Sequence, residues 1–342
     1  MCSGWSYDTY FDIQNIIDAM LIENIINPNI LRIDDRLILD CFKFQFANCP
    51  VYRQYVELLG VEVSSVEQIP FLPVRFFKTK KVYASNREPE AVFTSSGTGG
   101  MESSRHFVAD ASVYKRSYTL GFRYFFGDIS GYAVLALLPS YLERQGSSLI
   151  TMAQGLIEDS GNPLSGFFLN NHSELYNTLL VLKKNRQPTL LIGVSFALLD
   201  FLEKFAVDFP ELMVMETGGM KGRREEITRE ELHSLICLGF GVDRVYSEYG
   251  MTELLSQAYS KGKGIYRTPP WMQIVIRDPK DPFRKAPVET VGGVNIIDLA
   301  NIYSCSFIET QDLGLKHDDE SFEVTGRFDE SDVRGCNLLL RS

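Results

Sequence analysis

Short apolar runs alternate with helix-like segments along most of the chain after residue 90, and this alternation limits the possible fold more than any other feature. The runs are rich in β-branched and large aliphatic residues, and the stretches between them are long enough for helices. Alternation of strand and helix is typical of α/β proteins with mainly parallel sheets flanked by helices, which is the fold class we predict. The predicted strands of this part are Tyr132–Leu138, Thr189–Val194, Leu212–Glu216 and Arg244–Tyr246.

The two ends of the chain have other patterns. Helical spacing of apolar residues covers about Phe11–Ile26, Arg32–Ala47 and Val51–Leu59, and Gly60 is suited to end the third helix. Pro70 and Pro73 indicate a linker. From Met272 onward the pattern becomes strand-rich, which predicts a smaller antiparallel subdomain. Its predicted strands are Gln273–Ile276, Thr290–Ile297, Ser304–Ile308 and Ser321–Val324. The predicted regions are 1–90, helical; 91–271, an α/β core; 272–327, strand-rich; and 328–342, a short C-terminal segment.

Composition excludes several classes of protein. The 342 residues can bury a sizeable core, and the net charge of -10 disfavours nucleic acid as a partner, because binding to phosphate backbones requires clustered lysine and arginine. Acidic residues interrupt the first thirty positions, which contradicts a signal peptide, and no apolar stretch is long enough to span a bilayer. We therefore expect a cytoplasmic protein. The six cysteines form no C-x-x-C pair and the four histidines lack metal-ligand spacing, so neither a disulfide framework nor a zinc site is predicted.

A run of small hydroxyl residues and glycines follows the apolar stretch 91–93. It comprises Thr94, Ser95, Ser96, Gly97, Thr98, Gly99 and Gly100. Backbone N–H groups of such a turn can converge on an anion, so the run is a candidate phosphate-binding loop. It is not a Walker loop, because no Gly-Lys-Ser/Thr sequence closes it. A plain loop between two strands has the same composition.

Three further segments combine a strand end with chemically useful residues. The segment 245–253 ends in Tyr249-Gly250-Met251-Thr252-Glu253, where a carboxylate can hold Mg²⁺ beside a phosphate. The same residues also suit a helix N-terminus, with Thr252 as cap and Glu253 favouring the dipole. A second strand is followed by Gly218 and Gly219. The last segments are Glu309-Thr310-Gln311-Asp312-Leu313-Gly314 and Val324-Thr325-Gly326-Arg327-Phe328-Asp329.

Taken in order, these four segments resemble the motifs of the adenylate-forming superfamily, which includes acyl-CoA synthetases, luciferase and peptide-synthetase adenylation domains. The resemblance covers about residues 91–336 and implies a large adenylate-forming domain that uses ATP and Mg²⁺. It implies that Ser95, Ser96, Gly97, Thr98 and Gly99 grip the phosphates. It further implies that Tyr249, Gly250, Thr252 and Glu253 contact nucleotide and metal, with Glu253 as metal ligand and Thr252 and Glu253 as catalytic residues. By the same resemblance, Gly218 and Gly219 lie beside adenine, Asp312 binds the ribose, and Arg327 ends the large domain.

Two departures from the superfamily pattern narrow the resemblance. The phosphate loop lacks the usual lysine and offers only Arg105 nearby, and the chain stops fifteen residues after Arg327, so that a C-terminal lid domain is expected to be truncated or absent. The segment from Pro139 to Leu149 and the ending Asp332-Val333-Arg334-Gly335-Cys336 resemble the acyl-protein synthetases of bacterial bioluminescence, with phenylacetate-CoA ligases as relatives. That branch implies activation of a fatty acid, acylation of Cys336 as catalytic nucleophile, and transfer to an acyl-CoA reductase-like partner. A nearby Arg334 would favour the thiolate.

Three other functions remain open on the sequence. Leu190–Ala197 runs from strand to turn to helix around Ser195, as in a serine hydrolase, and Asp312 and His317 follow in the order such a triad requires. An acyl- or aryl-CoA ligase would use the same adenylation chemistry with CoA as acceptor. An inert scaffold would keep the fold without the reaction. The length of the acid, the acyl acceptor and the oligomeric state are not specified by the sequence.

Overall fold

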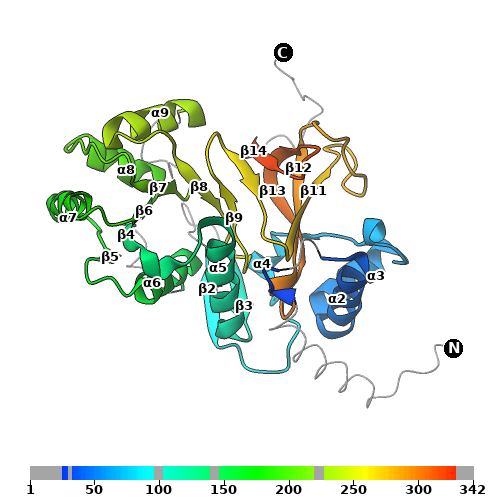
Figure 1. Ribbon diagram of the computed structural model, residues 1–342. Helices are drawn as coiled ribbons and strands as arrows, with labels where there is room; N and C mark the ends of the chain where they lie inside the picture. The colour runs from blue at the N-terminus through cyan, green and yellow to red at the C-terminus, as the bar shows by residue number, and fades with distance from the viewer. Residues whose placement is uncertain (1–24, 30–32, 96–102, 139–145, 219–226, 329–342) are drawn as a thin grey trace.

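A computed structural model describes residues 25–29, 33–95, 103–138, 146–218 and 227–328 (Figure 1). One long sheet crosses the molecule, and strand order along it is β11-β12-β13-β14-β10-β9-β8-β7-β6-β4-β5. The five strands from β8 to β5 are parallel, whereas those from β8 to β11 are antiparallel. The predicted α/β class is confirmed. The antiparallel strands continue the parallel ones within a single sheet, and the region boundaries at 91, 272 and 328 stay predictions.

The parallel half is the most apolar part of the sheet. Every residue of β4 and β6 is buried, as expected for strands covered on both faces. The predicted strand Arg244–Tyr246 is shifted, because the observed strand extends over polar residues that are buried between two neighbours, including Ser247 and Glu248. The parallel strands are β4 (Ala133–Leu137), β5 (Gly166–Phe167), β6 (Thr189–Gly193), β7 (Met213–Glu216) and β8 (Tyr246–Tyr249).

Helices connect and flank these strands (Figure 1). Most begin at a side chain that accepts a backbone N–H of the first turn, namely Asp110, Ser147, Asn171 and Thr228. A short 3₁₀ turn, η3 (Ile129–Gly131), precedes β4. The helices are α5 (Ala111–Phe126), α6 (Ser148–Ser160), α7 (His172–Lys184), α8 (Ser195–Leu202) and α9 (Arg229–Phe240).

The antiparallel half contains the four strands predicted after Met272. The predicted strand Ser304–Ile308 is displaced, because Ser304 closes a turn on Asn301 and pairing with the neighbouring strand begins at Phe307. Two short strands, β9 (Ala258–Ser260) and β10 (Ile265–Arg267), join this half to β8. The remaining elements are β11 (Met272–Arg277), β12 (Gly292–Asp298), η4 (Leu299–Asn301), β13 (Phe307–Lys316) and β14 (Phe322–Arg327).

A separate two-stranded sheet carries the Ser/Gly run. Strand β2 (Ala91–Thr94) pairs antiparallel with β3 (Arg105–Val108), and the two strands lie beside α5 (Figure 1). The run between them therefore connects the strands of a hairpin. Most of its residues, 96–102, lie outside the described part of the chain.

Two N-terminal helices agree with the predicted periodicity. They are α2 (Asp35–Asn48), capped by Asp34, and α3 (Pro50–Leu59), which ends at Gly60 in the left-handed conformation with φ of 64°. The helix predicted over Phe11–Ile26 falls mostly outside the described residues. The predicted linker at Pro70 and Pro73 is wrong in part, because strand β1 (Leu72–Pro73) there pairs parallel with β13. The short elements η2 (Val66–Gln68) and α4 (Phe76–Thr79) flank it.

The buried amide of Gln45 fastens α2 to the antiparallel half. Its Nε2 donates to the carbonyls of Asn301 and Ile302 at 3.1 and 3.0 Å, and its Oε1 accepts the Ser306 N–H at 2.9 Å. These backbone groups lie at the end of η4 and in the turn that leads to β13, where the Asn301 carbonyl also accepts the Ser304 N–H at 2.9 Å. Gln45 thus completes the hydrogen bonding of a buried turn from a distant helix.

We predict that Gln45→Met, which conserves volume but removes the Gln45 partner of the Ile302 carbonyl and of the Ser306 N–H, lowers the free energy of unfolding by about 2 kcal/mol or more. Denaturant titration of the purified variant measures this loss. The control Arg36→Met changes a side chain that is 91% exposed on the same helix, and we expect it to stay within about 0.5 kcal/mol of the parent. Equal effects of the two substitutions would contradict this role of Gln45.

Candidate active site

The candidate site lies where the parallel strands end. Strands β7 and β8 are neighbours in register, with Glu216 opposite Ser247, so the glycines that follow them, Gly218 and Gly250, lie at the same edge of the sheet. Ligands of open α/β sheets bind at the carboxyl ends of the strands. The predicted glycine and tyrosine motifs therefore share one edge, as the adenylate-forming resemblance requires.

Three predicted site residues meet through the Asp312 carboxylate. Tyr249 Oη donates to Asp312 Oδ2 at 2.8 Å, and Arg327 Nε donates to Asp312 Oδ1 at 3.1 Å. The residues come from β8, β13 and β14, and Asp312 and Arg327 are direct partners across the last two strands. The Thr310 hydroxyl holds Asp312 in place by accepting its backbone N–H at 3.1 Å. We call Tyr249, Asp312 and Arg327 the carboxylate cluster.

The carboxylate cluster has one rigid side and one open side. Tyr249 is held as a proton donor, because burial and then the Asp312 charge raise the pKa of its phenol well above the usual value. The Arg327 side chain is 75% exposed. A ligand can approach from the Arg327 side, where the guanidinium is exposed, whereas the Asp312 side chain is only 12% exposed.

A second carboxyl, that of Glu248, lies beneath the Tyr-Gly turn. A Cβ at Gly250 would meet the Glu248 carboxyl, so a larger residue at this position of the turn would require that side chain to move. Burial, reinforced by the charge of Glu216, raises the pKa of Glu248 from 4.5 to about 8. Glu248 is therefore mainly neutral near pH 7.

Glu216, at the end of β7, remains ionised. Burial opposes ionisation, but His233, Ser247 and the Gly218 N–H favour it, and the net result is a lowered pKa. Its Oε2 accepts the Gly218 N–H at 2.7 Å and the Ser195 hydroxyl at 3.3 Å, and His233 Nε2 lies 3.8 Å from Oε1. Glu216 thus fixes the turn at Gly218, which has φ of 81°.

The predicted metal residue Glu253 is buried on the turn after β8. Burial raises the pKa of its carboxyl, whereas Ser104 and the charges of Arg327 and Lys78 act in the opposite direction. A buried carboxylate with little compensating charge attracts a cation. Within the described ranges, no group of three or more His, Cys, Asp or Glu side chains could hold a metal. The donor chemistry nevertheless fits Mg²⁺, which commonly uses one or two carboxylates together with substrate phosphates.

The start of the Ser/Gly run is fixed against the strand that follows it. The Ser95 N–H donates to the Ser104 carbonyl at 3.2 Å, and the Ser104 N–H donates to Ser95 Oγ at 2.9 Å. Ser104 also lies near the Glu253 carboxyl, so the run begins beside the predicted metal residue. The other predicted residues of the run, Ser96, Gly97, Thr98 and Gly99, lie outside the described residues, as do Gly219 and Cys336.

The triad of a serine hydrolase does not assemble. Ser195 is buried and donates to Glu216, and Asp312 is bound to Tyr249 and Arg327. His317 lies elsewhere, with Nδ1 at 2.8 Å from Glu289 and Nε2 at 3.1 Å from Glu323. The hydrolase hypothesis is therefore wrong for these residues.

The sequence analysis missed Glu216 and Glu248, although both line the edge of the site. Glu216 ends the otherwise apolar strand β7, and Glu248 lies next to the last residue of β8; at both positions burial of a carboxylate is energetically costly. That position was the signal that could have identified them. Among the helices of the described chain, none has the length and apolarity that a membrane span needs.

Comparison with solved structures defines the class. The chain resembles a 2-hydroxyisobutyryl-CoA ligase solved with 2-HIB-AMP and CoA, with a TM-score of 0.62 at 16% identity over 86% of this chain and 74% of that one. It also resembles an ATP-bound RpMatB-BxBclM chimera, with a TM-score of 0.54 at 17% identity over 69% of this chain. It spans 48% of the chimera's length. The fold is that of the adenylate-forming ligases.

Sequence relatives define the family more closely. The family model described as "Acyl-protein synthetase, LuxE" matches residues 15–124. A long-chain-fatty-acid–luciferin-component ligase of Vibrio harveyi is 23% identical over 90% of this chain and 87% of its own length. A protein of the same name from Photorhabdus luminescens is 32% identical over 28% of this chain and 92% of its own length. The chain belongs to the acyl-protein synthetase family.

The raised pKa of Glu248 predicts a pH-dependent stability. A carboxyl with a higher pKa in the folded than in the unfolded state binds its proton more tightly when folded, so stability is lost as the pH rises from about 4.5 to 8. Glu248→Gln removes this loss. We expect the melting temperature of Glu248→Gln minus that of the parent to be at least about 2 °C higher at pH 8 than at pH 5. Calorimetry measures the difference, and the control Glu57→Gln, on the exposed face of α3, should show a constant offset. A constant offset for Glu248→Gln would refute the assignment.

Proposed function

We propose that the chain activates a fatty acid with ATP and Mg²⁺ as the acyl adenylate and then transfers the acyl group to a protein cysteine. The observation that carries the proposal is the meeting of Tyr249, Asp312 and Arg327 at the carboxyl edge of the sheet, beside the buried carboxyl of Glu253. The name of the Vibrio harveyi relative supports a long-chain fatty acid as substrate. The family resemblance supports the protein acceptor.

The nucleotide would bind across the carboxylate cluster. Asp312 is an acceptor of the kind that binds ribose hydroxyls, and its partner Arg327 has an exposed guanidinium that a ligand can reach. Glu216 holds the turn at Gly218, and among the described residues no atom lies within 4 Å of the position of a Cβ there, so the adenine ring would lie beside this turn. These roles of Asp312, Arg327, Gly218 and Tyr249 follow the resemblance, and the geometry is compatible with them.

The phosphates would lie between the Ser/Gly run and Glu253. Backbone N–H groups of the run and the Arg105 side chain, on β3, supply positive potential. When bound, Mg²⁺ supplies charge neutralisation on the phosphate oxygens. Glu253 would hold it, with Thr252 beside it on the turn. Lys78 and Arg327 are close enough to lower the pKa of Glu253 and thus to favour the ionised ligand.

The chemistry then follows in two balanced steps. A carboxylate oxygen of the acid attacks the α-phosphorus of ATP, which forms the acyl phosphate bond of the adenylate and releases pyrophosphate. The thiolate of Cys336 attacks the acyl carbonyl carbon, which forms a thioester and releases AMP. Energy from the phosphoanhydride thereby activates an otherwise unreactive acid toward sulfur nucleophiles.

The cysteines in the described part of the chain are poor candidates for the acyl acceptor, and this supports Cys336 in that role. Burial raises the pKa of Cys41 to about 12, and it also raises that of Cys305 and Cys49. Cys237 is partly exposed, yet burial and then the Asp243 charge raise its pKa as well. Because the thiolate is the nucleophile, none of these four is a suitable acyl acceptor.

The first step is tested by acid-dependent exchange of pyrophosphate into ATP, measured with the purified chain, Mg²⁺ and a panel of fatty and aryl acids. We predict exchange with fatty acids. Glu253→Gln should lower its kcat by about a hundredfold, because charge on the phosphates is no longer balanced. Fatty-acid binding, measured by calorimetry, should change less than about twofold, because a metal ligand at the phosphates would act on the nucleotide and not on the acid.

The matched control is Glu323→Gln, an acid on β14 whose carboxylate faces His317 rather than the carboxylate cluster. It should leave exchange unchanged. No exchange by folded parent protein would refute adenylation and favour an inert scaffold. Equal losses of exchange and acid binding in Glu253→Gln would contradict its role as metal ligand.

The second step is tested with Cys336→Ser. With labelled fatty acid, ATP and Mg²⁺, we expect the parent chain to retain label that neutral hydroxylamine releases, as for a thioester. Cys336→Ser should lose this label and keep full pyrophosphate exchange, whereas Cys237→Ser should behave as the parent. Labelling that survives in Cys336→Ser would refute the acceptor. Rapid formation of acyl-CoA by either protein on addition of CoA would favour the CoA ligase alternative.

A further inference from the structure

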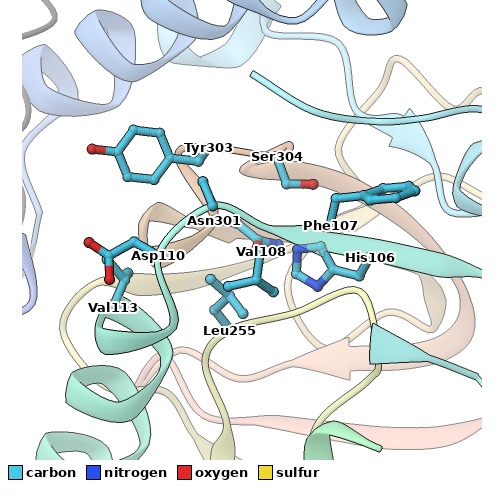
Figure 2. A pocket seen from close by; sticks show the side chains of 10 residues that line it. His106, Phe107, Val108, Asp110, Val113, Leu255, Asn301, Tyr303 and Ser304 are labelled. Atoms are coloured by element: carbon cyan, nitrogen blue, oxygen red, sulfur yellow. The ribbon is translucent and has the colours of Figure 1, made fainter. Parts of the chain in front are cut away.

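Two buried side chains bind the two consecutive carbonyls of the Thr252-Glu253 turn. His106 Nδ1 lies 2.8 Å from the Thr252 carbonyl oxygen, and Asn301 Nδ2 donates to the Glu253 carbonyl at 2.6 Å. His106 and Asn301 are both fully buried. They come from β3 and η4, elements far apart in the chain that meet at this turn (Figure 2).

The imidazole of His106 has a defined tautomer. A carbonyl oxygen accepts only, so Nδ1 carries the hydrogen. Burial lowers the pKa of His106 from 6.5 to about 4, and the ring is therefore neutral at pH 7 with a lone pair on Nε2. His106 acts at the turn as a fixed hydrogen-bond donor and contributes no charge beside Glu253.

Side chains of β3 connect this turn to the Ser/Gly run. Ser104 and His106 alternate along the chain and so point to the same side, where Ser104 lies near the Glu253 carboxyl and His106 binds the Thr252 carbonyl. The rings of Phe77 and Phe93 pack edge-on against His106, with centroids 5.7 and 6.4 Å away. The imidazole is therefore held in one orientation.

The residues around Asn301 are equally fixed. Asp298, which is fully buried, accepts the N–H groups of Leu255 and Ser256 at 2.9 and 3.0 Å and that of Ala300 at 3.1 Å. The Asn301 carbonyl is bound by Gln45. The backbone from Thr252 to Ser256 thus has a buried partner at four groups, which is far more than a surface turn requires.

A small cavity lies beside His106 and Asn301. His106 and Asn301 line it together with apolar residues such as Val108 and Leu255 (Figure 2). In the described part of the chain, His106 Nε2 and Asn301 Oδ1 are buried atoms without a hydrogen-bond partner. Both are acceptors, so one molecule with two donor hydrogens, such as water, would satisfy the two together.

We propose that His106 and Asn301 are positioning residues of the adenylation step, which fix the backbone of the turn that carries Glu253. The proposal rests on the proposed function and deepens it. If these two buried positions served only the stability of the fold, aliphatic or aromatic side chains without polar atoms would be sufficient there. His106 and Asn301 instead donate hydrogen bonds to the backbone carbonyls of Thr252 and Glu253.

The test compares His106→Phe, which keeps the ring and loses the donor, with His106→Asn, whose amide nitrogen can replace Nδ1. His106→Phe should lower kcat of pyrophosphate exchange by about ten- to hundredfold and leave KM for the fatty acid within about twofold. His106→Asn should recover most of the rate. The control Phe201→Leu removes a buried ring of α8 that stacks on Phe240, and should lower the melting temperature without changing kcat.

Hydrogen–deuterium exchange of the segment 249–255 provides a readout that does not depend on activity. We expect faster exchange there in His106→Phe and in Asn301→Leu, and parent-like exchange in His106→Asn. The Asn301→Leu variant keeps the test valid if His106→Phe does not fold. Parent-like kcat and parent-like hydrogen exchange in a folded variant would overturn the proposal. A parent chain without pyrophosphate exchange would instead refute the proposed function, while the hydrogen-exchange arm still tests the positioning.

Discussion

The antiparallel pairing of β14 with β10 is the contact on which the arrangement of the site depends. Tyr266 pairs with Phe322 there, and their rings pack with that of Tyr249 at centroid distances of 5.5 to 6.0 Å. This pairing joins the antiparallel strands to the parallel sheet and brings Asp312 and Arg327 beside Tyr249. Without it, the carboxylate cluster would lose two of its three members.

The edge of the sheet concentrates carboxyl groups that differ in their state of ionisation. Glu216 stays charged through its partners, whereas Glu248 is held neutral by burial and by that neighbouring charge. Asp312 is compensated by Arg327, and Glu253 has little compensation. The surroundings of these carboxyl groups therefore determine which of them are charged. A charge on Glu248 next to that of Glu216 would cost more free energy than protonation of Glu248 does.

The sequence was sufficient for the fold class and for most strands, because apolar runs and turn residues are local signals. Strand ends were less predictable where burial depends on distant partners, as at Ser247 and at Phe307. Tyr249, Gly250, Asp312 and Arg327 could be selected from motif order. The structure brings Tyr249, Asp312 and Arg327 together, and the roles of all four stay predictions. Glu216, His106 and Asn301 could not be selected in this way, because a lone polar residue acquires its role only from the turn it contacts. The roles of the Ser/Gly run and of Cys336 stay predictions.

The attachment of the N-terminal helices has a consequence for how this chain folds. Gln45 bonds to Ser306 across 261 residues, and β1 finds its ladder partner only in β13. During synthesis, residues 34–80 therefore emerge long before the surface that completes them. Contacts between residues so far apart in the sequence slow folding, and the apolar faces of the helices stay exposed until the later residues have been synthesised. Residues 34–80, although synthesised long before β13, are therefore among the last parts that can reach their final environment.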